Sequence, residues 1–192
     1  MHKIKKKLHI IGAGGHSKVV IDNSNIKKQF GNVYFYDDRY PMVKKIHTFK
    51  VFNTVKNIEF NKDDYYFVAI GDNKIRKKFI NFLIKKKLKL ATIAHKTSVI
   101  SVYSKILPGT YIGPKAIINS NALINVGCII NTAAIVEHDC VIGDYCHIAP
   151  NSVLGGGVEI GSNTLVGIGS VIVPNIKIKK NSFIKAGEII KK

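Results

Sequence analysis

Aliphatic residues recur every six positions over residues 98–190, and this pattern dominates the chain. The unbroken series is Ile100, Ile106, Ile112, Ile118, Ile124, Ile130, Val136, Ile142, Ile148, Leu154, Ile160, Val166, Ile172, Ile178, Ile184 and Ile190. Because six is a multiple of two, these side chains lie on one side of an extended chain. In an α-helix a step of six turns about 240°, which would scatter them over several faces. The repeat therefore predicts β-structure and excludes a helix over this segment.

Each six-residue unit, here called a hexad, must end in a turn, because strands usually run about 3–10 residues. Three short strands per coil would stack the aliphatic side chains inside a triangular prism, which predicts a β-solenoid of about five coils. We expect the turns to use the conformational freedom of glycines that directly follow an aliphatic position. These glycines are Gly113, Gly143, Gly155, Gly161 and Gly167. The period leaves the handedness of the solenoid open.

The segment before the hexads opens on a short apolar run, Leu8–Ile11, which leads into a glycine-rich turn over residues 12–17. A helix is expected over residues 18–27. A strand, a glycine turn and a helix are typical of the start of a nucleotide-binding βαβ unit. The alternative is an ordinary βα turn, because Ser17 stands where the dinucleotide fingerprint has its third glycine.

A second strand, Val33–Tyr36, ends in Asp37 and Asp38, whose carboxylates could accept hydrogen bonds from a ribose or could serve a turn. Residues 39–64 are polar, with a short strand expected near residues 49–52. A third strand over 65–70, a basic helix over 74–87 and a strand over 88–93 complete the segment. The sequence thus predicts a small, mainly parallel α/β domain over residues 1–94 and a solenoid over residues 95–192.

Composition narrows the class of protein. The chain has 192 residues and a net charge of +18, but its lysines are dispersed and not interleaved with aromatic residues, which disfavours nucleic-acid binding. Cys128, Cys140 and Cys146 fall on inward positions of the hexads without a zinc-binding spacing, so we expect reduced core residues and no metal. No apolar run reaches the roughly 18 residues of a membrane span. The basic start, residues 1–7, precedes an apolar run too short for a signal peptide, which favours a cytoplasmic protein.

Several motifs together resemble a known family. They are Gly12-Ala13-Gly14-Gly15-His16, Asp37-Asp38, the segment 69–76, Asn131-Thr132 and the segment 136–143. In this order they resemble bacterial hexapeptide-repeat sugar O- and N-acetyltransferases over nearly the whole chain. One group in this family acetylates UDP-linked 4-amino-sugars, and a sibling group O-acetylates sialic acids.

The resemblance implies a Rossmann-like N-terminal domain followed by a left-handed parallel β-helix that forms a homotrimer. It also implies that acetyl-CoA binds in the groove between neighbouring helices and that the UDP-sugar is held by the N-terminal domain. Family members usually continue beyond the last coil, whereas this sequence stops two residues after Ile190, so the outer end of the coenzyme pocket is expected to differ. By resemblance, the nucleotide-sugar contacts are Gly14, Gly15, His16, Asp37, Asp38 and Gly71. The acetyl-CoA contacts are His147, Ile168 and Ala186.

The family motif places the catalytic base at His138 and its polarising acid at Asp139. His138 lies two positions after inward Val136, near a corner of the prism, and His147 points outward from a face. Outward histidines are often only solvated, but the acids flanking His138 favour a general base, because an imidazole titrates near neutrality. Asp139, or alternatively Glu137, would orient the ring. Backbone N–H groups would stabilise the oxyanion, and direct transfer needs no nucleophilic side chain.

The sequence thus predicts an acetyl-CoA-dependent N-acetyltransferase that acts on a UDP-linked 4-amino-sugar. Two alternatives stay open. One is O-acetylation of a sialic-acid-like sugar, and the other is a non-catalytic solenoid that binds nucleotide-sugars.

Overall fold

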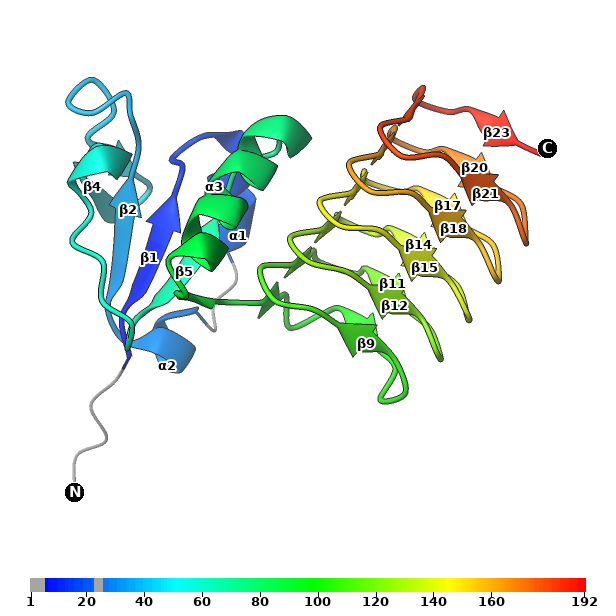
Figure 1. The fold of residues 1–192 in the computed structure, drawn as a ribbon, viewed down its shortest axis with the longest axis horizontal. Coiled ribbons are helices and arrows are strands. Elements are labelled where there is room, and N and C mark those ends of the chain that lie inside the picture. The colour runs from blue at the N-terminus through cyan, green and yellow to red at the C-terminus, as the bar shows by residue number, and fades with distance from the viewer. Residues whose placement is uncertain (1–5, 23–25) are drawn as a thin grey trace. The chain divides into compact units, whose positions relative to one another are not determined.

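A computed structural model describes residues 6–22 and 26–192 of the chain (Figure 1). The chain divides into two compact units, Met1–Ala91 and Thr92–Lys192. The expected helix over 18–27 and the basic start over 1–7 both fall partly outside the described residues. No helix among the described residues is long and apolar enough to cross a membrane.

The first unit is an α/β domain, as predicted. Its sheet has the order β3-β4-β2-β1-β5-β6, and every neighbouring pair is parallel except β3 and β4. The strands are β1 (Leu8–Ile11), β2 (Val33–Tyr36), β3 (Lys45–Ile46), β4 (Phe49–Asn53), β5 (Tyr65–Val68) and β6 (Lys89–Leu90). The helices are α1 (Gly15–Ile21), α2 (Ile26–Phe30), the 3₁₀ turn η1 (Val55–Asn57) and α3 (Asn73–Lys85).

The apolar strand β1 is buried along its whole length because it lies between β2 and β5 at the centre of the sheet. Helix α3 begins after Asp72, whose side chain accepts a hydrogen bond from the backbone N–H of Ile75 at 2.8 Å. One expectation was wrong. The single strand over 88–93 is two strands, β6 and β7 (Ile93–Ala94), because the chain passes from one sheet to another between them.

The second unit is the predicted solenoid, a left-handed parallel β-helix whose stacked triangular coils are visible in Figure 1. Every third strand pairs in parallel, so partners lie 18 residues apart, as Ile118 and Val136 do. The strands after β7 are β8 (Val99–Ile100), β9 (Lys105–Ile106), β10 (Tyr111–Ile112), β11 (Ile117–Ile118), β12 (Leu123–Ile124), β13 (Ile129–Ile130), β14 (Ile135–Val136), β15 (Val141–Ile142), β16 (His147–Ile148), β17 (Val153–Leu154), β18 (Glu159–Ile160), β19 (Leu165–Val166), β20 (Val171–Ile172), β21 (Lys177–Ile178), β22 (Phe183–Ile184) and β23 (Ile189–Ile190).

The second residue of each of these hexad strands is the predicted aliphatic position, and it points into the prism. From Ile112 to Ile172 these side chains are at most 2% exposed, and they form one continuous core with the small residues between them. Full burial of such a side chain contributes about 1.5–3 kcal/mol relative to exposure. The repeat therefore supplies the continuous apolar core that stabilises the solenoid.

The role expected for the glycines after the aliphatic positions was wrong. Backbone with positive φ occurs two residues further on, where Asn121 (φ 60°) and Gly157 (φ 69°) lie. The glycines are required by space instead. A Cβ atom on Gly143 would lie 2.5 Å from the backbone nitrogen of Ser162 in the next coil. The coils stack closely at these positions, and only glycine leaves room for the neighbouring backbone.

Candidate active site

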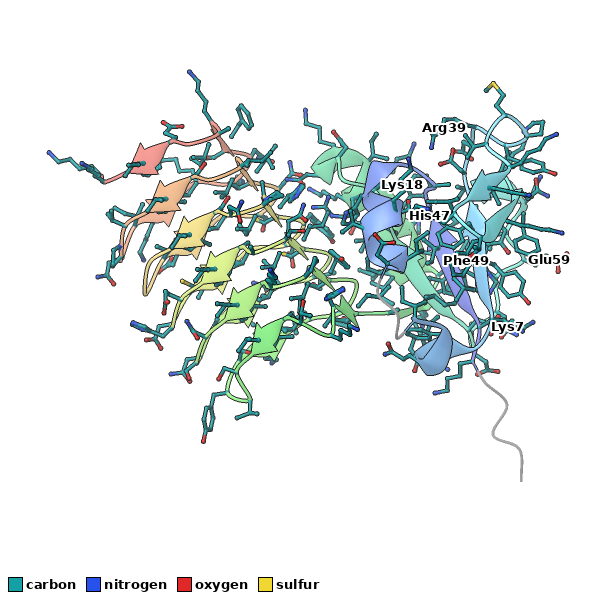
Figure 2. All side chains as sticks on the ribbon, turned by 180° about the vertical axis from the view of Figure 1, so that it is seen from behind. Lys7, Lys18, Arg39, His47, Phe49 and Glu59 are labelled. Atoms are coloured by element: carbon teal, nitrogen blue, oxygen red, sulfur yellow. The ribbon has the colours of Figure 1, made fainter. Side chains whose placement is uncertain are left out.

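A cavity of about 400 Å³ lies in the first unit at the carboxyl ends of β1, β2 and β5. Figure 2 shows Lys7, just before β1, and Arg39, just after β2, at opposite ends of this sheet. The chain leaves β1 and β5 toward opposite edges of the sheet, and ligands of open α/β sheets bind at such a switch point. The cavity is lined by all six residues predicted to contact the nucleotide-sugar, which are Gly14, Gly15, His16, Asp37, Asp38 and Gly71.

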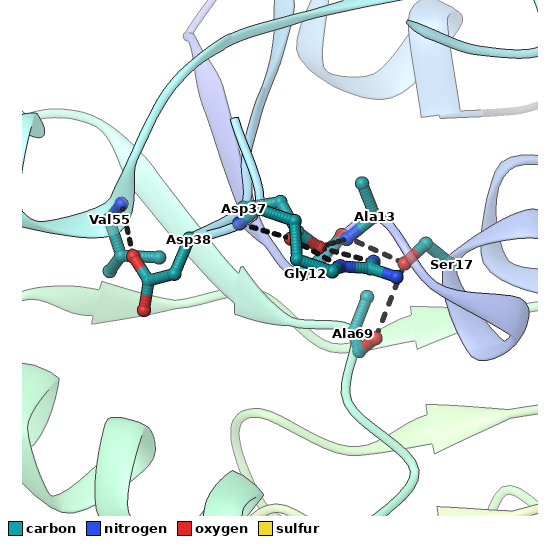
Figure 3. Close-up of polar contacts among 8 residues, drawn as sticks. Gly12, Ala13, Ser17, Asp37, Asp38, Val55 and Ala69 are labelled. Carbon is teal, nitrogen blue, oxygen red and sulfur yellow. Dashed lines mark hydrogen bonds and ion pairs between the residues drawn. The ribbon is translucent and has the colours of Figure 1, made fainter. Parts of the chain in front are cut away.

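Asp37 shapes this cavity from within the protein (Figure 3). Its Oδ2 atom accepts a hydrogen bond from the backbone N–H of Ala13 at 2.7 Å. Arg39 donates to the same carboxylate from Nε at 2.8 Å, from Nη2 at 2.8 Å and from its backbone N–H at 3.0 Å. The hydrogen bonds from Arg39, followed by that from Ala13, lower the pKa of Asp37 to about 2. Oδ2 therefore holds the glycine turn against the end of β2, and both carboxylate oxygens bind Arg39.

Asp38 differs from its neighbour because its side chain is exposed on the cavity side. Its Oδ1 atom accepts a hydrogen bond from the backbone N–H of Val55 at 3.0 Å, which ties the end of β2 to η1. Among the described residues no donor reaches its Oδ2 atom. Asp38 thus presents an open carboxylate oxygen to a ligand.

Ser17 and Arg76 fix the rim of the cavity, and the sequence assigned neither of them a role. Ser17 Oγ donates to the carbonyl of Gly12 at 2.8 Å and lies 3.3 Å from the carbonyl of Ala69, which joins the glycine turn to the end of β5 (Figure 3). The Arg76 guanidinium donates to the carbonyls of Ile70 at 3.1 Å and Gly71 at 2.9 Å. Its side chain is almost fully buried, a signal that only the fold provides.

A second cavity of about 520 Å³ continues from the first, because both are lined by Asp38, Val55 and Phe79. Its remaining lining is aromatic and basic and comprises Thr54, Lys56, Phe60, Lys78 and Phe82. A planar aromatic ligand would stack well on such walls. The two cavities together offer backbone and carboxylate groups at the glycine turn and aromatic and basic side chains beyond Asp38.

In the solenoid, His138 lies in the turn after β14, and its Nδ1 atom is 2.7 Å from Oδ2 of Asp139. An ionised carboxylate only accepts hydrogen bonds, so Nδ1 carries a proton, and in the neutral imidazole Nε2 presents the lone pair. The contacts from His138 and then from Asn121 lower the pKa of Asp139. Glu137 does not contact the ring. Its carboxylate lies 3.4 Å from the backbone nitrogen of His138.

His147, Ile168 and Ala186 come together in a groove of about 500 Å³ on the solenoid. His147 Nε2 is 3.0 Å from Nδ2 of Asn131, whose Oδ1 accepts from the backbone N–H of Thr132 at 2.8 Å. The rest of the lining is mainly apolar and comprises Ala149, Pro150, Leu165, Gly167 and Phe183. A long, flexible and largely apolar chain would fit this surface.

The structure does not place His138 in that groove. His138 lies at the corner between β14 and β15, which belong to two different sheets, whereas His147 lies in β16 of the third sheet. Each coil contributes one strand to each sheet, so this corner is opposite the face that carries His147. Among the described residues, no three His, Cys, Asp or Glu side chains gather as metal ligands would.

Two parts of the chain match known protein families. Residues 7–83 match the family described as PglD N-terminal domain, and residues 127–156 match bacterial transferase hexapeptide repeats. GDP-perosamine N-acetyltransferase of Escherichia coli O157:H7 is 34% identical over 139 residues. The match covers 68% of this chain and 62% of that protein, so the chain spans less than two thirds of the length of this relative.

Solved structures extend the match to the whole chain. The acetyltransferase domain of PglB from Neisseria gonorrhoeae FA1090 is 30% identical, with a TM-score of 0.92 over 97% of this chain and 91% of that domain. PerB from Caulobacter crescentus, solved with CoA and GDP-perosamine, is 28% identical, with a TM-score of 0.86 over 99% of this chain and 90% of that one. The chain belongs to the hexapeptide-repeat sugar acetyltransferases.

Proposed function

We propose that this protein transfers the acetyl group of acetyl-CoA to the amino group of a nucleotide-linked 4-amino-sugar. The observation that carries the proposal is the 2.7 Å contact between His138 Nδ1 and Asp139 on the outside of the hexapeptide solenoid. The ligands of the relatives support it. PerB was solved with CoA and GDP-perosamine, and the PglB domain has also been solved with acetyl coenzyme A.

In the proposed reaction, the sugar amine attacks the thioester carbonyl, the C–N bond forms, and the C–S bond breaks to release CoA. His138 Nε2 removes the proton that the amine must lose. Asp139 holds the other ring nitrogen, which keeps the tautomer and stabilises the imidazolium as it forms. The apolar groove at His147 would hold the pantetheine arm of the coenzyme along Ile168 and Ala186.

The nucleotide would occupy the paired cavities of the first unit. Its phosphates would lie at the glycine turn, its ribose at the open oxygen of Asp38, and its base against the aromatic walls of the second cavity. The family resemblance favours UDP. GDP is the second candidate, because the E. coli relative is named for GDP-perosamine and PerB was solved with it.

Replacing Asp38 by Ala should weaken nucleotide binding by about tenfold, the size expected for one charge-assisted hydrogen bond. Calorimetric titration with UDP and with GDP gives the affinity and identifies the preferred base. Acetyl-CoA affinity should stay unchanged and serves as the control. An unchanged nucleotide affinity would reject Asp38 as a ligand, and a loss of both affinities would indicate misfolding.

We also expect a homotrimer, because the corner of His138 and the groove of His147 are separated within one chain and a second copy can bring them together. Exposed apolar residues of the solenoid agree with this, among them Val102 at 88% and Phe183 at 66% exposure. Ile129, the outward residue directly before inward Ile130, is only 1% exposed and therefore gives no support to the trimer. Light scattering should give about three times the mass of one chain. An active monomer would contradict both the assembly and the shared site.

The proposed function itself is tested by release of free thiol from acetyl-CoA with a panel of acceptors. UDP- and GDP-linked 4-amino-sugars should support turnover, and the matching 4-hydroxy-sugars should not. Turnover with a sialic-acid-like acceptor alone would favour O-acetylation. No thiol release with any acceptor, together with tight nucleotide-sugar binding, would favour the non-catalytic solenoid.

A further inference from the structure

Gly156 lies directly against the imidazole of His138. The backbone N–H of Gly157 donates to the carbonyl of His138 at 2.9 Å, which places the turn of residues 155–157 beside His138 in the next coil. A Cβ atom on Gly156 would lie 2.6 Å from both Cε1 and Nε2 of His138, and 3.3 Å from its Nδ1. Real Cβ atoms essentially never lie within 3.0 Å of such an atom, so the imidazole would have to shift. The ring therefore occupies the space that any other residue at position 156 would fill.

The backbone does not explain this glycine. Gly156 is not among the glycines with positive φ, whereas its neighbour Gly157 is. The same position of the hexad carries a side chain in every other repeat from Val102 to Lys192. The other occupants are Val102, Pro108, Pro114, Ser120, Val126, Thr132, His138, Asp144, Pro150, Ser162, Ile168, Pro174, Lys180, Ala186 and Lys192. The solenoid thus accepts a Cβ atom at this position, and at residue 156 the atoms nearest to that place belong to the imidazole of His138.

We propose that Gly156 is a positioning residue for His138: its missing side chain leaves the space in which the imidazole lies with Nδ1 on Asp139 and Nε2 accessible. The inference rests on the proposed role of His138 as the base. Asp139 holds one edge of the ring by a hydrogen bond, and Gly156 defines the surface against which the ring lies. A methyl group at this position displaces the ring and weakens its hydrogen bond to Asp139.

The test is a double-mutant cycle of Gly156→Ala and His138→Ala in the full chain. Gly156→Ala alone should lower kcat by about 10²-fold, as expected for a misplaced catalytic group. The KM values for both substrates should stay within about twofold of wild type, because neither binding site is changed. In the His138→Ala background the same substitution should change neither kcat nor the melting temperature, because the ring that it displaces is absent.

A second readout does not depend on turnover. Because the hydrogen bond from His138 lowers the pKa of Asp139, Gly156→Ala should raise that pKa toward its ordinary value of 3.8. Carbon-13 NMR titration of the carboxyl group measures it. If His138 proves not to be the base, this shift still appears, which separates failure of the proposed function from failure of the positioning role.

Two outcomes would overturn the inference. One is a Gly156→Ala protein with kcat and the Asp139 titration both unchanged, since the imidazole would then not rest on Gly156. The other is an equal loss of melting temperature in both backgrounds, since Gly156 would then serve the stacking of the coil. Gly143→Ala is the control for such stacking, because its Cβ atom would meet the backbone of Ser162 and no catalytic group.

Discussion

Replacing His138 by Ala should lower kcat by about 10²–10⁴-fold, the usual cost of removing a general base. Both substrates should still bind, because His138 lies at a corner of the solenoid, outside the paired nucleotide cavities and the His147 groove. Folding should be unaffected, since the side chain is 62% exposed and outside the aliphatic core. Initial rates at saturating substrate, with melting temperature and trimer mass checked, measure the effect.

Two further variants act as controls for this prediction. Asp139→Asn should cost less than His138→Ala, because the ring remains but loses its charged partner. His147→Ala should mainly raise the KM for acetyl-CoA, because His147 lines the proposed coenzyme groove and does not lie at the corner that carries His138. The wild-type rate should rise with pH through the range in which imidazoles lose their proton. In His138→Ala the rate should no longer show this rise. A His138→Ala protein that keeps more than about a tenth of wild-type kcat contradicts the mechanism.

Replacing Asp37 by Asn should destabilise the protein by about 1–2 kcal/mol, a value that allows for solvent screening at the exposed side of Arg39. The amide keeps the shape of the carboxylate but turns one acceptor into a donor toward Ala13 or Arg39. The folded-state pKa of about 2 lies below the ordinary value of 3.8, so the charged form is favoured by folding. Its contribution is complete above pH about 4 and is lost as pH falls through about 2.

Thermal unfolding of wild type and Asp37→Asn over a pH series measures this contribution. The difference in melting temperature should be constant near neutral pH and should disappear in strong acid. Asp38→Asn is the matched control, because Asp38 is exposed and, within residues 6–22 and 26–192, accepts a single hydrogen bond, from Val55. If the two variants were equally stable at neutral pH, Asp37 would not be the residue that holds the glycine turn.

The sequence alone determined the solenoid, its strands and the two-unit order of the chain. Each aliphatic residue from Ile100 to Ile190 marks its own strand, because a period of six allows no other regular structure to bury them together. The strands Leu8–Ile11 and Val33–Tyr36 were also predicted with their observed bounds, since they are apolar runs closed by glycine or by acids. These signals depend only on residues that are close together in the chain, so one sequence is enough to recognise them.

Only the tertiary structure decided which neighbours each polar or small residue meets. Asp37 and Asp38 look equivalent in the sequence, yet one is bound by Ala13 and Arg39 while the other faces the cavity. Gly156 looks like a turn residue, and its contact with His138 arises because the coil repeats every 18 residues. A hexad pattern fixes which way a side chain points. It does not fix what lies one coil away, because that depends on the closure of the coil in space.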